Sequence, residues 1–447
     1  MNSSTDVATL LQDNAAMRDS FEGELRAVSG ALLQVHGLTI DYFRQSPTRI
    51  AAQYTLDLES NEGGRASQII TVAHFTDGRV ERQWKRMRAD APDAEEPVGP
   101  FHLPGAHYSD TLQSIIQVFP FDARLPGLRR IVAGSPEMRR LVSPGGAEHI
   151  VSWRADVVRY RPDMRAMARV EVVHGGGRQG QTERVYAKAY REIEDGQRAY
   201  DLLAAIAARA EPPDGFHAPR PLAWDPGLRT LLIAEATGDR LLDIIRQNDD
   251  NLAPRAVRRA ARAVAAMHGS DIAPALLPAA SPDRDHQFAE VSGQLLRVFP
   301  ERADAIQALV SQIEAAFRPA PPRPTHYDLK QGHILVDPAV VTILDFDKMA
   351  MGDPLIDVAN VVATLSAERE GSTRRAARRE SLAELFVEEY FSCVPAEWAA
   401  LFPAHLARAT LVEAATTGRG NRGRRGIAQP GDRLAAALRR AEELLAT

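Results

Sequence analysis

The chain has 447 residues, of which 45% are hydrophobic and 25% are charged, and its formal net charge is −5 at pH 7. This composition is typical of a globular protein with two or three compact units, and the small negative charge gives no reason to expect nucleic acid or an anionic membrane as a partner. The single cysteine, Cys393, excludes an internal disulfide framework and a thiolate metal cluster, which fits a reducing, cytoplasmic location.

Two further features of the composition guide the search for a site. No apolar stretch approaches the roughly 20 residues that span a bilayer, so we expect neither export nor a membrane span. Lysine is rare while arginine is abundant, and codon bias is the plain explanation. Each exception is nevertheless a candidate for a specific role: Lys85, Lys188, Lys330 and Lys348.

The first 150 residues carry no motif with recognisable chemistry. A helix is expected over residues 7–25, and alternation of apolar and polar residues from His36 to Phe75 predicts three antiparallel strands. An acidic, Pro-rich linker follows at residues 91–103. The pattern from Tyr108 to Leu141 predicts a helix that prolines break.

A second set of three strands is predicted from Asp156 to Tyr190, followed by a helix over residues 192–210. The segments Tyr42–Leu56 and Val158–Val172 share a strand, a Pro-containing turn and a second strand that begins at arginine. This similarity suggests a decayed internal duplication, in which His74 lies near the place of Lys188. Chance similarity between two generic meanders is the alternative.

The most informative segment begins at Thr325 and reads THYDLKQGHILVDPAVVTILDFDKMAMGDPLIDVAN. Two short apolar runs flank a turn at Asp337 and Pro338 and predict a β-hairpin. His326, Asp328 and His333 precede the hairpin and Asp345 follows it, so its closure should bring them together. Phosphoryl transfer requires such groups: Asp328 as the base, Asp345 as the metal ligand and Lys330 near the transferred phosphoryl.

These residues resemble the aminoglycoside phosphotransferase and choline kinase family. The family's catalytic loop, H-x-D-x-x-x-x-N, is matched by His326 and Asp328, which with Lys330 are the expected catalytic residues, and His333 stands at its last position. Its I-D-[FW] segment is matched at residues 344–346, and its G-D-P-x-x-D segment at residues 352–357.

The resemblance implies an α+β, protein-kinase-like fold of two lobes, with an antiparallel sheet in the N-lobe and a mainly helical C-lobe. We assign the N-lobe to residues 151–234 and the C-lobe to residues 235–447. Residues 1–150 form an additional α+β domain, either a cap over the substrate or a dimerisation module, and could be a degenerate repeat of the N-lobe. Monomer and homodimer both stay open.

The family's loop asparagine is a magnesium ligand, and this chain has His333 instead. Magnesium prefers oxygen donors. Three interpretations stay open: His333 binds a softer ion such as Mn²⁺, it contacts phosphate, or it marks a site that binds nucleotide without turnover.

Other site residues follow from the resemblance. Lys188, on the third predicted strand, would hold the phosphates of ATP, and Glu194 is the first candidate for its helix partner, ahead of Gln197 and Asp201. Arg165 would contact phosphate from the turn between the first two strands. Glu235 and Thr237 would lie at the adenine hinge. We expect structural roles for His268, Asp353 and Asp357.

The function predicted is ATP- and Mg²⁺-dependent phosphorylation of a hydroxyl on a sugar, aminosugar, aminocyclitol or amino alcohol. An inactive nucleotide-binding pseudokinase is the alternative. A protein kinase is disfavoured because no A-P-E segment follows Asp345.

Overall fold

The computed structural model describes residues 4–29, 33–61, 63–175, 180–209, 215–272, 274–279, 283–367, 373–420 and 430–446. Two compact units make up the chain. The first contains Met1–Tyr200 and Pro221–Glu235, and the second contains Asp201–Arg220 and Ala236–Thr447.

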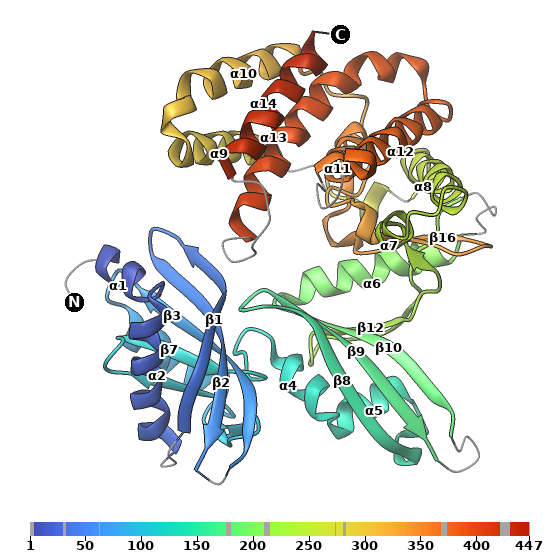
Figure 1. Cartoon of the computed structure of the whole chain (residues 1–447). Coiled ribbons are helices and arrows are strands. Elements are labelled where there is room, and N and C mark those ends of the chain that lie inside the picture. Colours follow the sequence, from blue (N-terminus) through green and yellow to red (C-terminus); the bar gives the residue numbers. More distant parts are fainter. Residues whose placement is uncertain are drawn as a thin grey trace. The chain divides into compact units, whose positions relative to one another are not determined.

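The first unit opens with two helices followed by a five-stranded antiparallel sheet, drawn in blue and cyan in Figure 1. The strand order is β1-β2-β3-β7-β6. Its elements in chain order are α1 (Ser4–Leu10), α2 (Asn14–Ser29), β1 (Leu33–Gln45), β2 (Arg49–Ser60), β3 (Arg65–Phe75), α3 (Val80–Asp90), β4 (Pro97–Val98), β5 (Leu103–Pro104), β6 (Ala106–Ser109) and β7 (Ser114–Val118).

The first core forms because strands alternate their side chains between two faces. On β2, Ile50, Ala52, Tyr54, Leu56 and Leu58 are all buried. These side chains share a core with the buried residues of α2. The hydroxyl of Tyr54 donates a hydrogen bond to the carbonyl of Leu11, at 2.6 Å, so its one polar atom has a partner inside the core.

A second pair of helices and a second five-stranded sheet follow. The strand order is β11-β12-β10-β9-β8, again antiparallel throughout. The elements are α4 (Pro126–Ala133), α5 (Pro136–Val142), η1 (Ala147–His149), β8 (Ile150–Arg161), β9 (Arg165–His174), β10 (Thr182–Tyr190), α6 (Ile193–Ala207), β11 (Pro221–Asp225) and β12 (Thr230–Ala234). Apolar residues of α4 and α5 pack on one face of this sheet.

The helix expected over residues 108–141 is wrong in its first part. Residues there form the hairpin β6–β7, and the prolines at 126 and 136 begin α4 and α5 instead of breaking a helix. All five residues of β7 are buried, so the alternation that would reveal a strand is absent from the sequence. Proline suits the first helical position because no intrahelical bond needs its missing N–H group.

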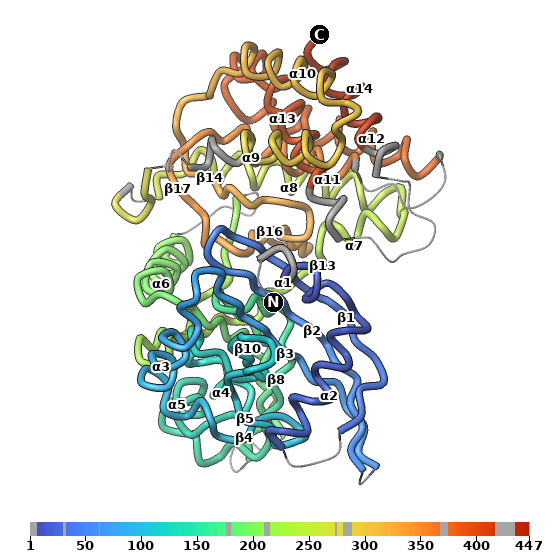
Figure 2. Tube along the Cα trace, turned by 90° about the vertical axis from the view of Figure 1, so that its left-hand side faces the viewer, coloured from blue at the N-terminus to red at the C-terminus, as the bar shows by residue number. Residues whose placement is uncertain are grey.

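The second unit is mainly helical (Figure 2). Its helices are α7 (Leu241–Arg246), α8 (Leu252–His268), α9 (Asp283–Val298), α10 (Ala303–Ala316), α11 (Leu355–Ala367), α12 (Thr373–Phe391), α13 (Phe402–Gly420) and α14 (Pro430–Leu445). Short strands β13 (Asp239–Arg240), β14 (Arg323–Thr325), β15 (Ile334–Val336), β16 (Val341–Ile343) and β17 (Ala350–Gly352) pair as β13-β15-β16 and β14-β17. No helix within the described residues combines the length and apolarity of a membrane span.

The antiparallel sheets before residue 235 and the helices after it confirm the expected α+β fold.

Candidate active site

The predicted hairpin is β15–β16, and its closure creates the site. Ile334 pairs with Ile343 and Val336 pairs with Val341. The amide of Leu344 donates to the carbonyl of His333 at 2.8 Å, which extends the pairing beyond both strands. This hydrogen bond keeps His333, just before the hairpin, close to Leu344, just before Asp345.

The hairpin and the preceding loop bring three predicted site residues together. Asp328, His333 and Asp345 each offer a ligand atom, and these atoms all lie within 4.8 Å of one another. All three side chains are half-buried. Among the described residues, this is the one group of three or more such side chains that could hold a metal ion.

The ring of His333 is oriented by the backbone. Its Nδ1 lies 2.9 Å from the carbonyl oxygen of Asp328, which can only accept, so Nδ1 carries the proton and donates. Burial, with the charges of Lys330 and His326 adding to it, lowers the pKa of His333 to about 4. The neutral ring therefore keeps a lone pair on Nε2, which is the form that ligates metals.

His326 contacts both Asp328, in its own loop, and Leu344, the residue before Asp345. It is completely buried. Its Nδ1 accepts the amide proton of Asp328 at 3.2 Å, so the proton sits on Nε2, which donates to the carbonyl of Leu344 at 2.8 Å. His326 thus ties the backbone of Asp328 to that of Asp345.

Two of the four lysines act on Asp328. The Nζ of Lys348 lies 3.5 Å from its Oδ1. Burial opposes the charge on Asp328, but Lys348 and Lys330 outweigh it and the pKa of Asp328 is lowered. The sequence reasoning assigned no role to Lys348. The scarcity of lysine in the sequence marks Lys348 as a candidate for a specific role, but it does not reveal that Lys348 pairs with Asp328.

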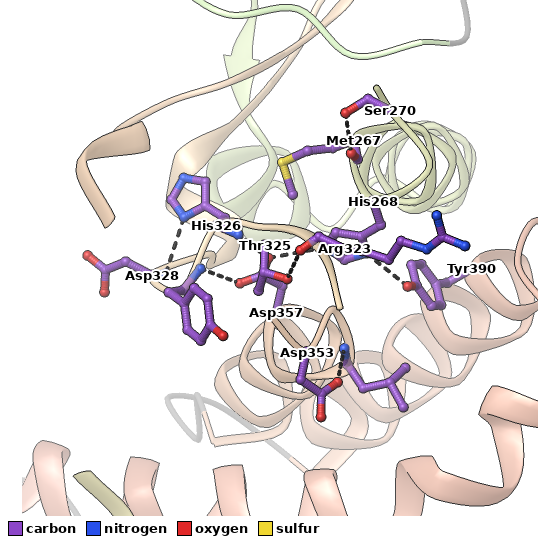
Figure 3. Close-up of polar contacts among 12 residues, drawn as sticks. Met267, His268, Ser270, Arg323, Thr325, His326, Asp328, Asp353, Asp357 and Tyr390 are labelled. Carbon is purple, nitrogen blue, oxygen red and sulfur yellow. Dashed lines mark hydrogen bonds and ion pairs between the residues drawn. The ribbon is translucent and has the colours of Figure 1, made fainter. Parts of the chain in front are cut away.

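The buried carboxylate of Asp357 holds the backbone of the loop that contains His326 and Asp328, as Figure 3 shows. Asp357, at the start of α11, accepts the amides of His326 (2.6 Å) and Tyr327 (2.8 Å) and the ring of His268 (3.1 Å). Nδ1 of that histidine meets the hydroxyl of Tyr390 at 2.8 Å. Asp357 and His268 therefore have the expected structural roles.

Asp353 also has the expected structural role. Its Oδ1 accepts the amide of Leu355 at the start of α11, and its Oδ2 accepts from His405 at 2.7 Å.

Two residues of the site have left-handed backbone. Tyr327 has φ +63° and Asp345 has φ +64°. Such a conformation costs a non-glycine residue about 1–2 kcal/mol and persists where the surroundings enforce it. The amide of Tyr327 is held by Asp357, and the residue before Asp345 is held by His326 and His333. The strain therefore lies where the chain carries its reactive groups.

The geometry agrees with the comparison of the chain with known proteins. Residues 178–400 match the model of the phosphotransferase enzyme family. Over this range the chain belongs to that family. The match includes β10 with Lys188, the loop of residues 326–333 and the hairpin β15–β16. None of the curated proteins compared with the sequence matches it.

Solved phosphotransferase structures are similar at low identity. A choline/ethanolamine kinase family protein from Mesorhizobium loti has 14% identity and a TM-score of 0.42, and the match covers 70% of this chain and 94% of that one. A choline kinase from Cryptosporidium parvum has 12% identity and a TM-score of 0.46, over 69% and 94%. An aminoglycoside phosphotransferase has 15% identity and a TM-score of 0.42, over 68% and 98%.

A cavity of about 770 Å³ lies beside the loop that contains Tyr327. Tyr327, which precedes Asp328 in the chain, lines it together with apolar residues of α9, α10 and β17 such as Phe288, Ile313 and Met351, and with Phe317 just after α10. Glu314 and Arg408 are among its polar residues, and the guanidinium of Arg408 lies 4.9 Å from the ring centroid of Phe288. A volume in this range suits a small-molecule ligand.

The remaining predicted residues lie on other elements. Lys188 is buried on β10, with its Nζ 5.5 Å from the ring centroid of Tyr190. Glu194 is exposed in the first turn of α6, and Arg165 is half-buried at the start of β9. In the segment after β12, Glu235 and Thr237 are exposed.

Proposed function

We propose that this protein transfers the γ-phosphoryl group of ATP to a hydroxyl of a small molecule. The observation that carries the proposal is the cluster of Asp328, His333 and Asp345, with ligand atoms within 4.8 Å of one another, inside a phosphotransferase family match. ATP is a co-substrate, and no covalent enzyme intermediate is needed.

Asp328 is the proposed base. Its lowered pKa keeps it ionised near neutral pH, so it can orient the acceptor hydroxyl and take its proton. The hydroxyl oxygen forms the new bond to γ-phosphorus while the bond to the bridging oxygen of ADP breaks. Lys330 is proposed to offset negative charge on the transferred group.

The donor set fits a divalent cation. Asp345 supplies a carboxylate oxygen and the neutral ring of His333 supplies nitrogen, a donor pair that suits Mn²⁺ better than the all-oxygen sets that Mg²⁺ prefers. Asp345 and His333 are the proposed ligands. When bound, the cation would neutralise negative charge on the phosphate groups.

His326 is proposed as a positioning residue, because both of its ring nitrogens are engaged by the backbone. Lys188 is proposed to hold the ATP phosphates, as the family pattern implies. Its buried place on the third strand of an antiparallel sheet supports this role.

The family pattern suggests the other nucleotide contacts. We retain Arg165 and Glu194 near the phosphates and Glu235 and Thr237 near adenine as part of the proposal. The division into residues 1–150, 151–234 and 235–447 belongs to the same proposal.

The acceptor is proposed to bind in the cavity next to Tyr327. Its lining is largely apolar and aromatic, with Glu314, Asp353 and Arg408 as charged groups. This lining favours an acceptor with an apolar or weakly cationic body over a polycationic sugar.

The test is ADP release by the purified protein with a panel of sugars, aminosugars, amino alcohols and aromatic alcohols, in Mg²⁺ and in Mn²⁺. Asp328→Asn should lower acceptor-dependent turnover by about 10²–10⁴-fold while ATP binding persists. Asp304→Asn, on the exposed start of α10, is the matched control. Equal turnover in the Asp328 variant and the control would reject the assignment.

The second candidate is a nucleotide-binding module without turnover, which the presence of His333 favours. His333→Asn separates the two. In a working enzyme this substitution should preserve or raise activity with Mg²⁺ and reduce the advantage of Mn²⁺. ATP binding with no turnover in either protein and either metal would support the binding module.

A further inference from the structure

The two sheets of the first unit are built alike. Each follows a pair of helices, and in each the first three strands form a meander, a helix comes next, and the last two strands join in reversed order. The inward residues of β2 and β9 correspond position by position: Ile50 with Ala166, Ala52 with Ala168, Tyr54 with Val170 and Leu56 with Val172, all of them buried. In both sheets this face meets the preceding helices.

The final hairpins share their hydrogen bonds as well. In the first, the side chain of Ser109 accepts the amide of Leu112, and the hydroxyl of Ser114 donates to the carbonyl of Leu112. In the second, Asp225 accepts the amide of Leu228, and Thr230 donates to its carbonyl.

The residue before the last strand also agrees between the two hairpins. It has φ +47° in both, at Gln113 and at Arg229. Hydrogen bonds and a backbone angle that recur at matching positions favour a duplication over two unrelated meanders.

The register identifies the counterpart of the proposed ATP-binding lysine. Lys188 pairs with Met167, the third residue of β9, and with Leu231, the second residue of β12. Ala73 pairs with Ala51 and Ile115 at the same positions of β2 and β7. Ala73 therefore occupies the position that corresponds to Lys188. The sequence similarity had placed this position at His74, one residue later.

A pocket of about 110 Å³ lies where the first sheet lacks the lysine. Ala73, Ile115 and Gln117 line it from the sheet, and Gln83, Arg86 and Asp90 from α3. Arg49, Arg124 and Asp163 complete its polar wall. The space is larger than one water molecule requires.

Two buried donors at this pocket have no acceptor among the described residues. They are Nε2 of Gln117, whose side chain is 1% exposed, and Nε of Arg49. A buried donor without a partner costs about 1–3 kcal/mol. The carboxylates present are engaged, since Asp163 pairs with Arg49 and Asp90 with Arg86. Arg124 leaves the lining with an excess of positive charge.

We propose that this pocket binds a small oxyanion, namely inorganic phosphate or the phosphate or carboxylate group of a metabolite. The oxyanion accepts from Gln117 and Arg49, and Arg124 supplies the positive charge that Asp90 and Asp163 leave uncompensated. In the first sheet, the lysine position has thus become a site for an isolated anionic group.

Occupancy of the pocket acts on the second sheet through Arg49. Its guanidinium pairs with Asp163, in the turn between β8 and β9. The amide of Asp163 donates in turn to Asp122 at 2.9 Å. An oxyanion bound to Arg49 competes with this ion pair. Its binding therefore weakens the contact between Arg49 and the turn that leads into Arg165.

The test is calorimetric titration of the full chain with inorganic phosphate and, separately, acetate, at constant ionic strength in chloride. Gln117→Glu keeps the acceptor for Ala123 but replaces the donor with a negative charge, so affinity should fall by at least about tenfold. Arg124→Gln, on the surface, should weaken binding about threefold. Arg82→Gln, exposed on α3 and outside the lining, is the control and should bind as the parent does.

Each outcome decides the proposal. Saturable binding that both pocket variants weaken supports it, and the stronger of the two ligands identifies the oxyanion. No saturable heat in the parent overturns it, because water then satisfies the donors. Binding that survives Gln117→Glu but is lost in Lys188→Ala also overturns it, because the anion then belongs to the second sheet. Circular dichroism of every variant checks that it is folded.

Discussion

The two sheets of the first unit share a buried face and differ on the other. One face of each is apolar and packs on two helices, with the same strand order. On the opposite face, the second sheet has a buried lysine at residue 188 and the first has Ala73 beside two donors without acceptors. The apolar face is thus common to the two sheets, while the opposite face has a buried lysine in the second sheet and an alanine at the matching position of the first.

The largest effect on turnover is expected from removing the lysine that distinguishes the two sheets. Lys188→Ala should reduce turnover by about 10²–10³-fold, because it removes a cation from the proposed phosphate site. Ala73→Ser, at the matching position of the first sheet, should leave turnover unchanged. Steady-state kinetics with ATP checks both. Similar losses in the two variants would show that the sheets are not functionally distinct.

An intermediate effect concerns Asp122, a buried carboxyl in the segment between β7 and α4. Burial, and secondarily the charge of Asp163, raises the pKa of Asp122 to about 7. A raised folded-state pKa stabilises the fold below the unfolded value near 4, and this contribution is lost as pH rises to about 7. Stability should therefore fall between pH 4 and pH 7 by an amount on the order of a few kcal/mol.

Urea denaturation at several pH values measures this loss. Asp122→Asn cannot titrate and should flatten the profile, whatever its effect on absolute stability. Asp110→Asn, at an exposed position, serves as the control. A profile that keeps its slope in the Asp122 variant would assign the pH dependence to another group.

The smallest effect sharpens the comparison at the hairpins. Ser114→Ala and Thr230→Val each remove a buried hydroxyl that donates to a leucine carbonyl. Each should lower the free energy of unfolding by about 1–3 kcal/mol, because the carbonyl loses its partner. Thr182→Val, at an exposed position on β10, controls for the change of side chain. Unequal costs at the two hairpins would indicate that the shared hydrogen bonds have different surroundings.

The hairpin of the candidate site could be predicted because its signals are local. The turn at Asp337 and Pro338 and the two apolar runs specify β15–β16, and closure then brings Asp328 and Asp345 together whatever surrounds them. The third-strand place of Lys188 followed from alternation in the same way.

Features that depend on tertiary contacts could not be predicted. The strand β7 is buried over its whole length, so its alternation is missing from the sequence. The pairing of Lys348 with Asp328 depends on how the segment after Asp345 turns, and no pattern encodes that path. The correspondence between Ala73 and Lys188 follows from the pairing of the strands. A count of residues along the sequence placed the counterpart of Lys188 one residue too late, at His74.

The shared carboxylate of Asp357 has a consequence for hydrogen exchange. It holds the amides of His326 and Tyr327 and also bonds to His268, on α8. Those two amides can therefore exchange with solvent only when the contact with α8 opens. Loops commonly exchange at the rate of their own fluctuations, whereas this one should exchange with the slow core of the second unit.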